Sequence, residues 1–210
     1  MTDNMSFEKV SQEYYDVLKE LGNIGAGNAT TALAQMLQCK VDMKVPQVRL
    51  LNFNEVGEVM GGEEQIVAGI YLAVEGDITG SMMFILEQEA AKSLVEKLMG
   101  MPLQDGLDEM GISALKEIGN IITGAYLNSL SQLTNLKMVP SVPDLSIDML
   151  NAILSVPAIE FGIMGDKILL IQTQFTDEVD LNGYFILLPD LDSYAKILKA
   201  VSYTHLTLPT

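Results

Sequence analysis

The sequence has few of the residues on which most catalytic chemistry depends. Its 210 residues include one cysteine, Cys39, one histidine, His205, and no tryptophan. A single cysteine excludes an internal disulfide and a CxxC redox pair. The two residues are also too few for a zinc cluster, and they leave little room for a Ser-His or Cys-His catalytic group. Enzymatic activity, if present, must therefore depend on other side chains.

Basic residues are scarce as well. The chain contains 12 Lys and Arg against 28 Asp and Glu, for a net charge of −16. The phosphates of nucleic acid and of anionic lipid would repel such a chain, so we expect neither as a partner. No apolar run approaches the roughly 18 residues that cross a bilayer, and we expect no membrane insertion. The first ten residues carry no secretory signal, which predicts a cytoplasmic protein.

The remaining composition is that of a globular protein. Hydrophobic residues make up 49% and charged residues 19%, which argues against intrinsic disorder. The length suits one domain or two small ones.

The last ten residues, VSYTHLTLPT, have no charge and no amphipathic pattern. We interpret residues 201–210 as a non-native tail from cloning or sequence assembly, and the alternative is a genuine short strand that closes a sheet edge.

An internal repeat organises the rest of the chain. Four motif positions correspond at a constant offset of 97, and KELGNIGAGNA in the first copy matches KEIGNIITGAY in the second. The first copy contains Asp16, Glu20, Asn23 and Pro46, and the second contains Ser113, Glu117, Asn120 and Pro143. Further along, Asp77 and Gly80 match Asp180 and Gly183 at an offset of 103. We interpret the chain as two half-repeats, about 8–100 and 108–200, of one domain spanning residues 1–200.

Each half has the same predicted order of elements. Long helices are expected over 8–38 and 108–134, with Asp108 as N-cap and Asn135 as the stop, and closing helices over 87–99 and 190–200. Strands are expected over 66–74, 78–86, 158–164, 168–176 and 182–188. These elements predict a single α/β domain of the α+β type with pseudo-two-fold symmetry. In it, an antiparallel sheet carries the two long helices packed together on one side.

The repeated polar residues share one face of each long helix. Positions i, i+4 and i+7 lie on one stripe, so Glu20 lies beside Asn23, and Glu117 beside Asn120. The plain alternative is a solvated face, but asparagine is a mediocre helix former that such a face has no need to use twice. The same helices carry several glycines, each of which costs about 0.5–1 kcal/mol relative to alanine. We expect them to permit close approach, either between the two helices or to a partner's backbone.

The pattern Asp/Ser-x3-Glu-x2-Asn, followed after 22 residues by Pro and present twice, resembles the CheC/CheX/FliY family of chemotaxis phosphatases. The resemblance covers residues 5–200. The length leaves no room for the extra flagellar-switch domains of FliY-type members. CheX-type members usually keep one motif and dimerise, whereas both motifs are complete here. The chain is therefore most similar to CheC-type members, and we expect a monomer.

The resemblance implies an enzyme that dephosphorylates the phospho-aspartate of a CheY-type response regulator. Asn23 and Asn120 would orient the attacking water, and Glu20 and Glu117 would hold a lysine of the docked regulator. The supporting motif residues would be Asp16 and Ser113 on the helix surface and Pro46 and Pro143 at the end of each motif.

The same resemblance implies what the partners supply. The chain would bind no metal or cofactor of its own, because Mg²⁺ is expected on the partner response regulator. A CheD-type deamidase is a second expected partner. The alternative function is a non-catalytic adaptor that binds phosphorylated receiver domains, CheD, or both.

Overall fold

The computed structural model describes residues 12–43, 47–60, 62, 64–103, 106–161, 167–172, 174–176 and 180–206. Pro46 lies outside the described residues. The first half contains α1 (Gln12–Leu37), β1 (Asp42–Met43), β2 (Gln47–Asn52), α2 (Phe53–Val59), β3 (Ile66–Gly76), β4 (Gly80–Glu87) and α3 (Gln88–Met99). The second half contains α4 (Glu109–Thr134), β5 (Met138–Pro140), β6 (Asp144–Met149), α5 (Leu150–Phe161), β7 (Lys167–Gln172), β8 (Gln174–Thr176), β9 (Asp180–Pro189) and α6 (Leu191–Leu206).

The two halves contain matching elements at the offsets seen in the sequence. The long helices α1 and α4 each have 26 residues and start 97 positions apart. Strands β2 and β6 have six residues each and are also 97 positions apart. The closing helices α3 and α6 begin 103 positions apart, as the second repeat segment predicts. The duplication in the sequence is therefore a duplication of structural elements.

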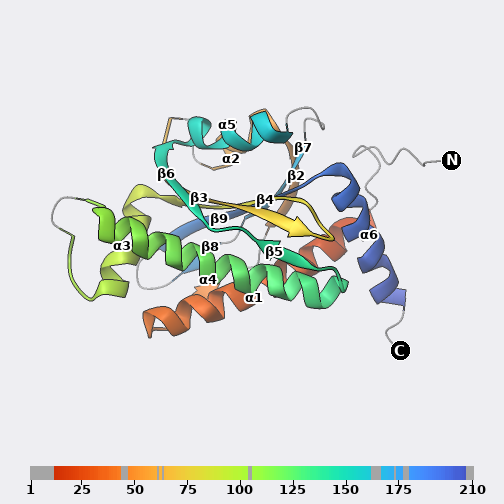
Figure 1. The fold of residues 1–210 in the computed structure, drawn as a ribbon, viewed down its shortest axis with the longest axis horizontal. Coiled ribbons are helices and arrows are strands. Elements are labelled where there is room, and N and C mark those ends of the chain that lie inside the picture. The colour runs from red at the N-terminus through yellow and green to blue at the C-terminus, as the bar shows by residue number, and fades with distance from the viewer. Residues whose placement is uncertain are drawn as a thin grey trace.

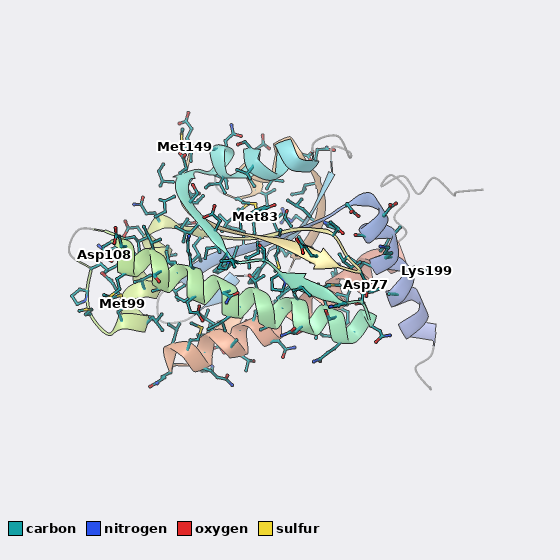
Figure 2. The ribbon with its side chains drawn as sticks, viewed as in Figure 1. Asp77, Met83, Met99, Asp108, Met149 and Lys199 are labelled. Atoms are coloured by element: carbon teal, nitrogen blue, oxygen red, sulfur yellow. The ribbon has the colours of Figure 1, made fainter. Side chains whose placement is uncertain are left out.

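The sheet is antiparallel, as predicted. Its order is β1-β8-β9-β4-β3-β5, with β6 added on β3 and β2 on β7, and every described strand pair is antiparallel. The two halves meet where β4 pairs with β9, and there Met83 lies opposite Ile186, the residue 103 positions later. Figure 2 shows Met83 near the middle of the sheet. Antiparallel pairing of equivalent strands is compatible with a two-fold relation between the halves, and the pseudo-two-fold symmetry itself stays a prediction.

Helices cover both faces of the sheet (Figure 1). On one face, α1 and α4 lie side by side, with α3 and α6 near their ends, and the larger hydrophobic cluster fills the space beneath them. On the other face, α2 and α5 cover a smaller cluster that includes Met60, Ile153 and Ile186. The two long helices are therefore packed together on one side of the sheet, as predicted.

Three sequence expectations differ from the structure. The strand expected over 158–164 is wrong over 158–161, because α5 continues through Phe161, and residues 162–164 lie outside the described residues. Leu150, Ile153 and Leu154 follow helical spacing and are buried against the sheet. A helix is therefore the conformation that removes these side chains from solvent. The sequence predicts Cys39, which stands near the end of the first long helix, to be a small buried hydrophobic residue, but it is exposed in the loop that follows α1. Strands β1, β2, β5 and β6 are additional to those expected. β1 and β5 have only two and three residues, and the alternation of β2 breaks at Leu50 and Leu51. By contrast, DLSIDM of β6 alternates polar and apolar residues, so the sequence does carry a strand signal there.

The C-terminal residues extend the last helix. α6 runs through Leu206, so the first part of the segment interpreted as a non-native tail is helical rather than a strand. This conformation does not bear on the origin of residues 201–210, which stays a prediction.

Tyr126 of α4 lies at the centre of the larger cluster and is completely buried. Its ring stacks on Phe185 of β9 at 5.4 Å between centroids. Its hydroxyl has no hydrogen-bond partner among the described residues, and burial raises the pKa of Tyr126 above that of a free tyrosine. A buried hydroxyl without a partner reduces stability.

We therefore expect Tyr126→Phe to raise the free energy of unfolding by about 1 kcal/mol, because it removes that hydroxyl and keeps the ring. Urea denaturation followed by circular dichroism measures this change. A loss of stability of similar size would show instead that the hydroxyl is satisfied in the folded protein.

Candidate functional site

The second long helix begins and ends where its sequence predicts, and the first ends at Leu37, while the start predicted for it at residue 8 lies outside the described residues. The Asp108 side chain accepts a hydrogen bond from the Gly111 amide of α4 at 2.8 Å, as an N-cap does. Figure 2 shows Asp108 at the start of that helix. Asn135 ends α4 in the left-handed conformation with φ of 54°. The segment NIGAGN, residues 23–28, is helical within α1, so it is not a phosphate-binding loop.

The motif side chains lie on the solvent face of both helices. All six are exposed: Asp16, Glu20, Asn23, Ser113, Glu117 and Asn120. The opposite face is buried against the sheet, with Leu115 and Ile118 of α4 and Leu21 and Leu33 of α1 in the core. Each helix therefore presents a carboxylate and a carboxamide one turn apart to the surroundings, as the sequence predicts.

The helices that carry the two motifs are in direct contact. Asn28 Nδ2 of α1 donates a hydrogen bond to Ser129 Oγ of α4 at 2.7 Å. Gly25 of α1 lies so close to the Tyr126 ring that an added Cβ would be 2.7 Å from its nearest carbon. Close helix packing, one of the two roles expected for the glycines, is therefore confirmed at Gly25. The cross-helix bond was not anticipated, because neither residue belongs to the repeated motif.

Glycines of the two helices differ in what surrounds them. A Cβ on Gly119 would lie 2.7 Å from Ile70 of β3, so that glycine lets α4 approach the sheet. By contrast, a Cβ on Gly27 or Gly124 would meet nothing within 4 Å. These two glycines, which recur at the repeat offset, are thus not required by packing within the described residues.

The surroundings of the second motif include one ion pair. Lys116 Nζ lies 3.5 Å from Asp144 Oδ1, and both side chains are well exposed, so the pair contributes little stability. Because Asp144 follows Pro143, this pair connects the motif proline to α4. The equivalent of Asp144 in the first repeat is Gln47, which cannot form the same ion pair. In the second repeat, the ion pair therefore connects the motif helix to the segment that contains the motif proline. Gln47 cannot form this ion pair in the first repeat.

The motif side chains themselves are available for contact. Among the described residues, no side-chain hydrogen bond engages Glu20, Asn23, Glu117 or Asn120. A cavity of about 250 Å³ lies on the far side of the sheet, between β3, β6 and α5, and no motif residue lines it. Within the described part of the chain, the exposed motif side chains therefore form an open surface.

Two further features concern metals and membranes. Within the described part of the chain, no three His, Cys, Asp or Glu side chains cluster in a way that could hold a metal ion. Of the helices described, none combines the length and the apolar character needed to cross a bilayer.

The family model and the similar proteins indicate the same family. The CheC-like family model matches residues 15–49 and 110–147, which contain both motifs and most of each motif helix. The chain is 41% identical to the CheY-P phosphatase CheC of Bacillus subtilis over 202 residues, which covers 93% of this chain and 97% of that protein.

Solved structures share the fold. The crystal structure of Thermotoga maritima FliY matches with a TM-score of 0.74 at 20% identity, over 93% of this chain and 98% of that one. A CheX-CheY-BeF3-Mg²⁺ complex from Borrelia burgdorferi matches with a TM-score of 0.53 at 16% identity, over 79% of this chain and 95% of that one. From the sequence identity over nearly its full length and the match at both motif helices, we conclude that the chain belongs to the CheC-like family.

Proposed function

We propose that this chain hydrolyses the phospho-aspartate of a CheY-type response regulator. One observation carries the proposal: an exposed Glu and Asn stand one turn apart, at the same register, on both of two packed helices. The relative with 41% identity is a CheY-P phosphatase, which supports assigning this activity to the paired motifs.

An open motif surface suits a folded protein as substrate. Glu20, Asn23, Glu117 and Asn120 are exposed, and the cavity of about 250 Å³ lies on the opposite face of the sheet. The exposed motif side chains do not enclose a phosphoryl group within the described part of the chain. The partner must supply the rest of the site, so the reaction takes place only at the docked interface.

The proposed reaction requires few catalytic groups from the chain itself. An acyl phosphate is already reactive, so catalysis consists mainly of placing a water in line with the leaving carboxylate. The water oxygen forms a bond to phosphorus, and the bond between phosphorus and the aspartate oxygen breaks with its electron pair on the carboxylate. The water protons pass to the released phosphate or to solvent. Asn23 or Asn120 would donate to and accept from that water through its carboxamide.

The positive charge at the reaction centre would come from the partner. The chain has a net charge of −16 and no cluster of basic residues in its motif. Phosphoryl transfer needs cations near the phosphoryl oxygens. We therefore place the Mg²⁺ and a lysine on the response regulator. Glu20 and Glu117 would bind that lysine by charge-assisted hydrogen bonds.

Replacing both glutamates, as Glu20→Gln with Glu117→Gln, should raise the KM for the phosphorylated regulator about 10-fold, because a hydrogen bond to a charged group contributes about 1.5–3 kcal/mol. The kcat should change less, since the carboxamides that orient the water remain. Steady-state phosphate release at several regulator concentrations separates the two constants. An unchanged KM would contradict the docking role.

The activity itself is tested by following phosphate release from a phosphorylated CheY-type regulator with and without the chain. Acceleration over the spontaneous rate is expected. Binding of the phosphorylated regulator without acceleration would favour the adaptor function instead.

The proposal extends to a second partner and to the state of the protein. Membership of the CheC-like family supports binding of a CheD-type deamidase, and two complete motifs in one chain support a monomer. We also propose that the chain acts in the cytoplasm, the location that its sequence predicts. Light scattering of the chain alone, and then mixed with CheD, tests the monomeric state and the CheD complex. A stable homodimer, or no complex with CheD, would contradict them.

A further inference from the structure

Gly27 and Gly124 are placed where the fold does not need a glycine. Both lie inside helices with ordinary helical backbone, and a Cβ at either would meet nothing within 4 Å. Gly25 and Gly119, by contrast, would bring a Cβ to 2.7 Å from Tyr126 and Ile70. Glycine inside a helix is unfavourable relative to alanine, so Gly27 and Gly124 lower stability without improving the packing of the described chain.

Their position relates them to the motif. Each glycine follows its asparagine by four residues, so Gly27 lies one turn beyond Asn23, and Gly124 one turn beyond Asn120, on the same stripe. The asparagines are exposed and the glycines half-exposed, in both helices. The arrangement occurs twice, on the face that bears the motif.

The length of the asparagine side chain explains why bare backbone would be needed there. A carboxamide on a single methylene reaches only a short way from its helix. To place a water against a phosphoryl group, the helix backbone must come very close to the partner. A methyl group one turn away would meet the partner first, because non-bonded carbons stay about 3.5–4 Å apart.

We propose that Gly27 and Gly124 are positioning residues of the phosphatase reaction: the main chain of the partner's phosphorylated loop packs against their bare backbone, which brings Asn23 or Asn120 within reach of the attacking water. The inference rests on the proposed function. It assigns a role to two residues that lie outside the Asp/Ser-Glu-Asn-Pro motif.

The test is a series at both positions, Gly27→Ala with Gly124→Ala, and Gly27→Leu with Gly124→Leu. Alanine and leucine are good helix formers, so the alanine pair should raise Tm by about 2–8 °C. The same pair should lower the kcat for phosphate release from the phosphorylated CheY-type regulator about 10-fold, and the leucine pair about 100-fold, because small misplacements of a reacting group are costly. KM should change less, since Glu20 and Glu117 still dock the regulator.

Controls separate this inference from the proposed function. Gln132→Ala, exposed and two turns beyond Gly124 on α4, should keep both activity and Tm. Gly25→Ala should lower Tm, because its Cβ has no space beside Tyr126. An alanine pair with a higher Tm and a lower kcat would support the inference. A substitution that acted only through the stability of the fold would change Tm and kcat in the same direction.

Full kcat in the alanine and leucine pairs would overturn the inference. If Asn23→Ala with Asn120→Ala abolished activity in the same experiment, the proposed function would stand. If the parent chain showed no acceleration at all, the proposed function would fall and the inference with it.

Discussion

Replacing Asn23 and Asn120 together by alanine is expected to lower the rate of phosphate release from a phosphorylated CheY-type regulator by about 10²–10³-fold. Removing one well-placed polar group at a reaction centre typically has an effect of this size, about 2.7–4 kcal/mol in activation free energy. Both asparagines are exposed and make no hydrogen bond to another described side chain. The measurement is initial rate at saturating regulator, with circular dichroism to verify the fold.

The single variants provide the control for this experiment. If the two sites act independently, Asn23→Ala or Asn120→Ala alone should retain much of the activity through the other site. Alanine is a better helix former than asparagine, so no loss of Tm is expected. A double variant that hydrolyses at the parent rate would show that the carboxamides do not orient the water.

Phe185→Ala is expected to lower the free energy of unfolding by about 3–5 kcal/mol, because it leaves a large cavity in the core. Phe185 is completely buried and stacks on Phe84 of β4 at 4.8 Å and on Tyr126 of α4 at 5.4 Å between ring centroids. It therefore connects the strand pair at the middle of the sheet to a motif helix. Urea denaturation measures the loss.

A matched truncation at the surface shows whether that loss comes from burial. Val142→Ala removes apolar atoms from a residue that is 87% exposed, and it should change the free energy of unfolding by less than about 0.5 kcal/mol. A loss below about 1 kcal/mol for Phe185→Ala would contradict the central position assigned to that ring.

The sequence predicts the features of this fold that depend on repetition and on helical period. The long helices, the β3–β4 hairpin, the closing helices, and the caps at Asp108 and Asn135 all follow from local patterns. The exposure of Glu20, Asn23, Glu117 and Asn120 follows from the same helical spacing, since the apolar residues between them face the sheet.

The sequence does not predict the features that depend on tertiary contacts. Strands β2 and β6 are edge strands that pair only with β7 and β3 among the described strands. The alternation of β2 breaks at Leu50 and Leu51, so its pairing defines it. DLSIDM of β6 alternates polar and apolar residues, and this signal was available in the sequence. The helical end of α5 was mistaken for a strand because a short apolar run fits either conformation. The repeat separates Gly27, which recurs as Gly124, from Gly25, whose equivalent is Ile122, but only the structure shows that Gly25 packs on Tyr126 and that Gly27 faces open space.

The most direct measurement is the decay of a phosphorylated CheY-type regulator, with Mg²⁺ present, after a substoichiometric amount of this chain is added. The account predicts that phosphate is released faster than the spontaneous rate and over many turnovers, and that the Asn23→Ala, Asn120→Ala double variant returns the decay to nearly that rate. Decay at the spontaneous rate in the presence of the parent chain would contradict it.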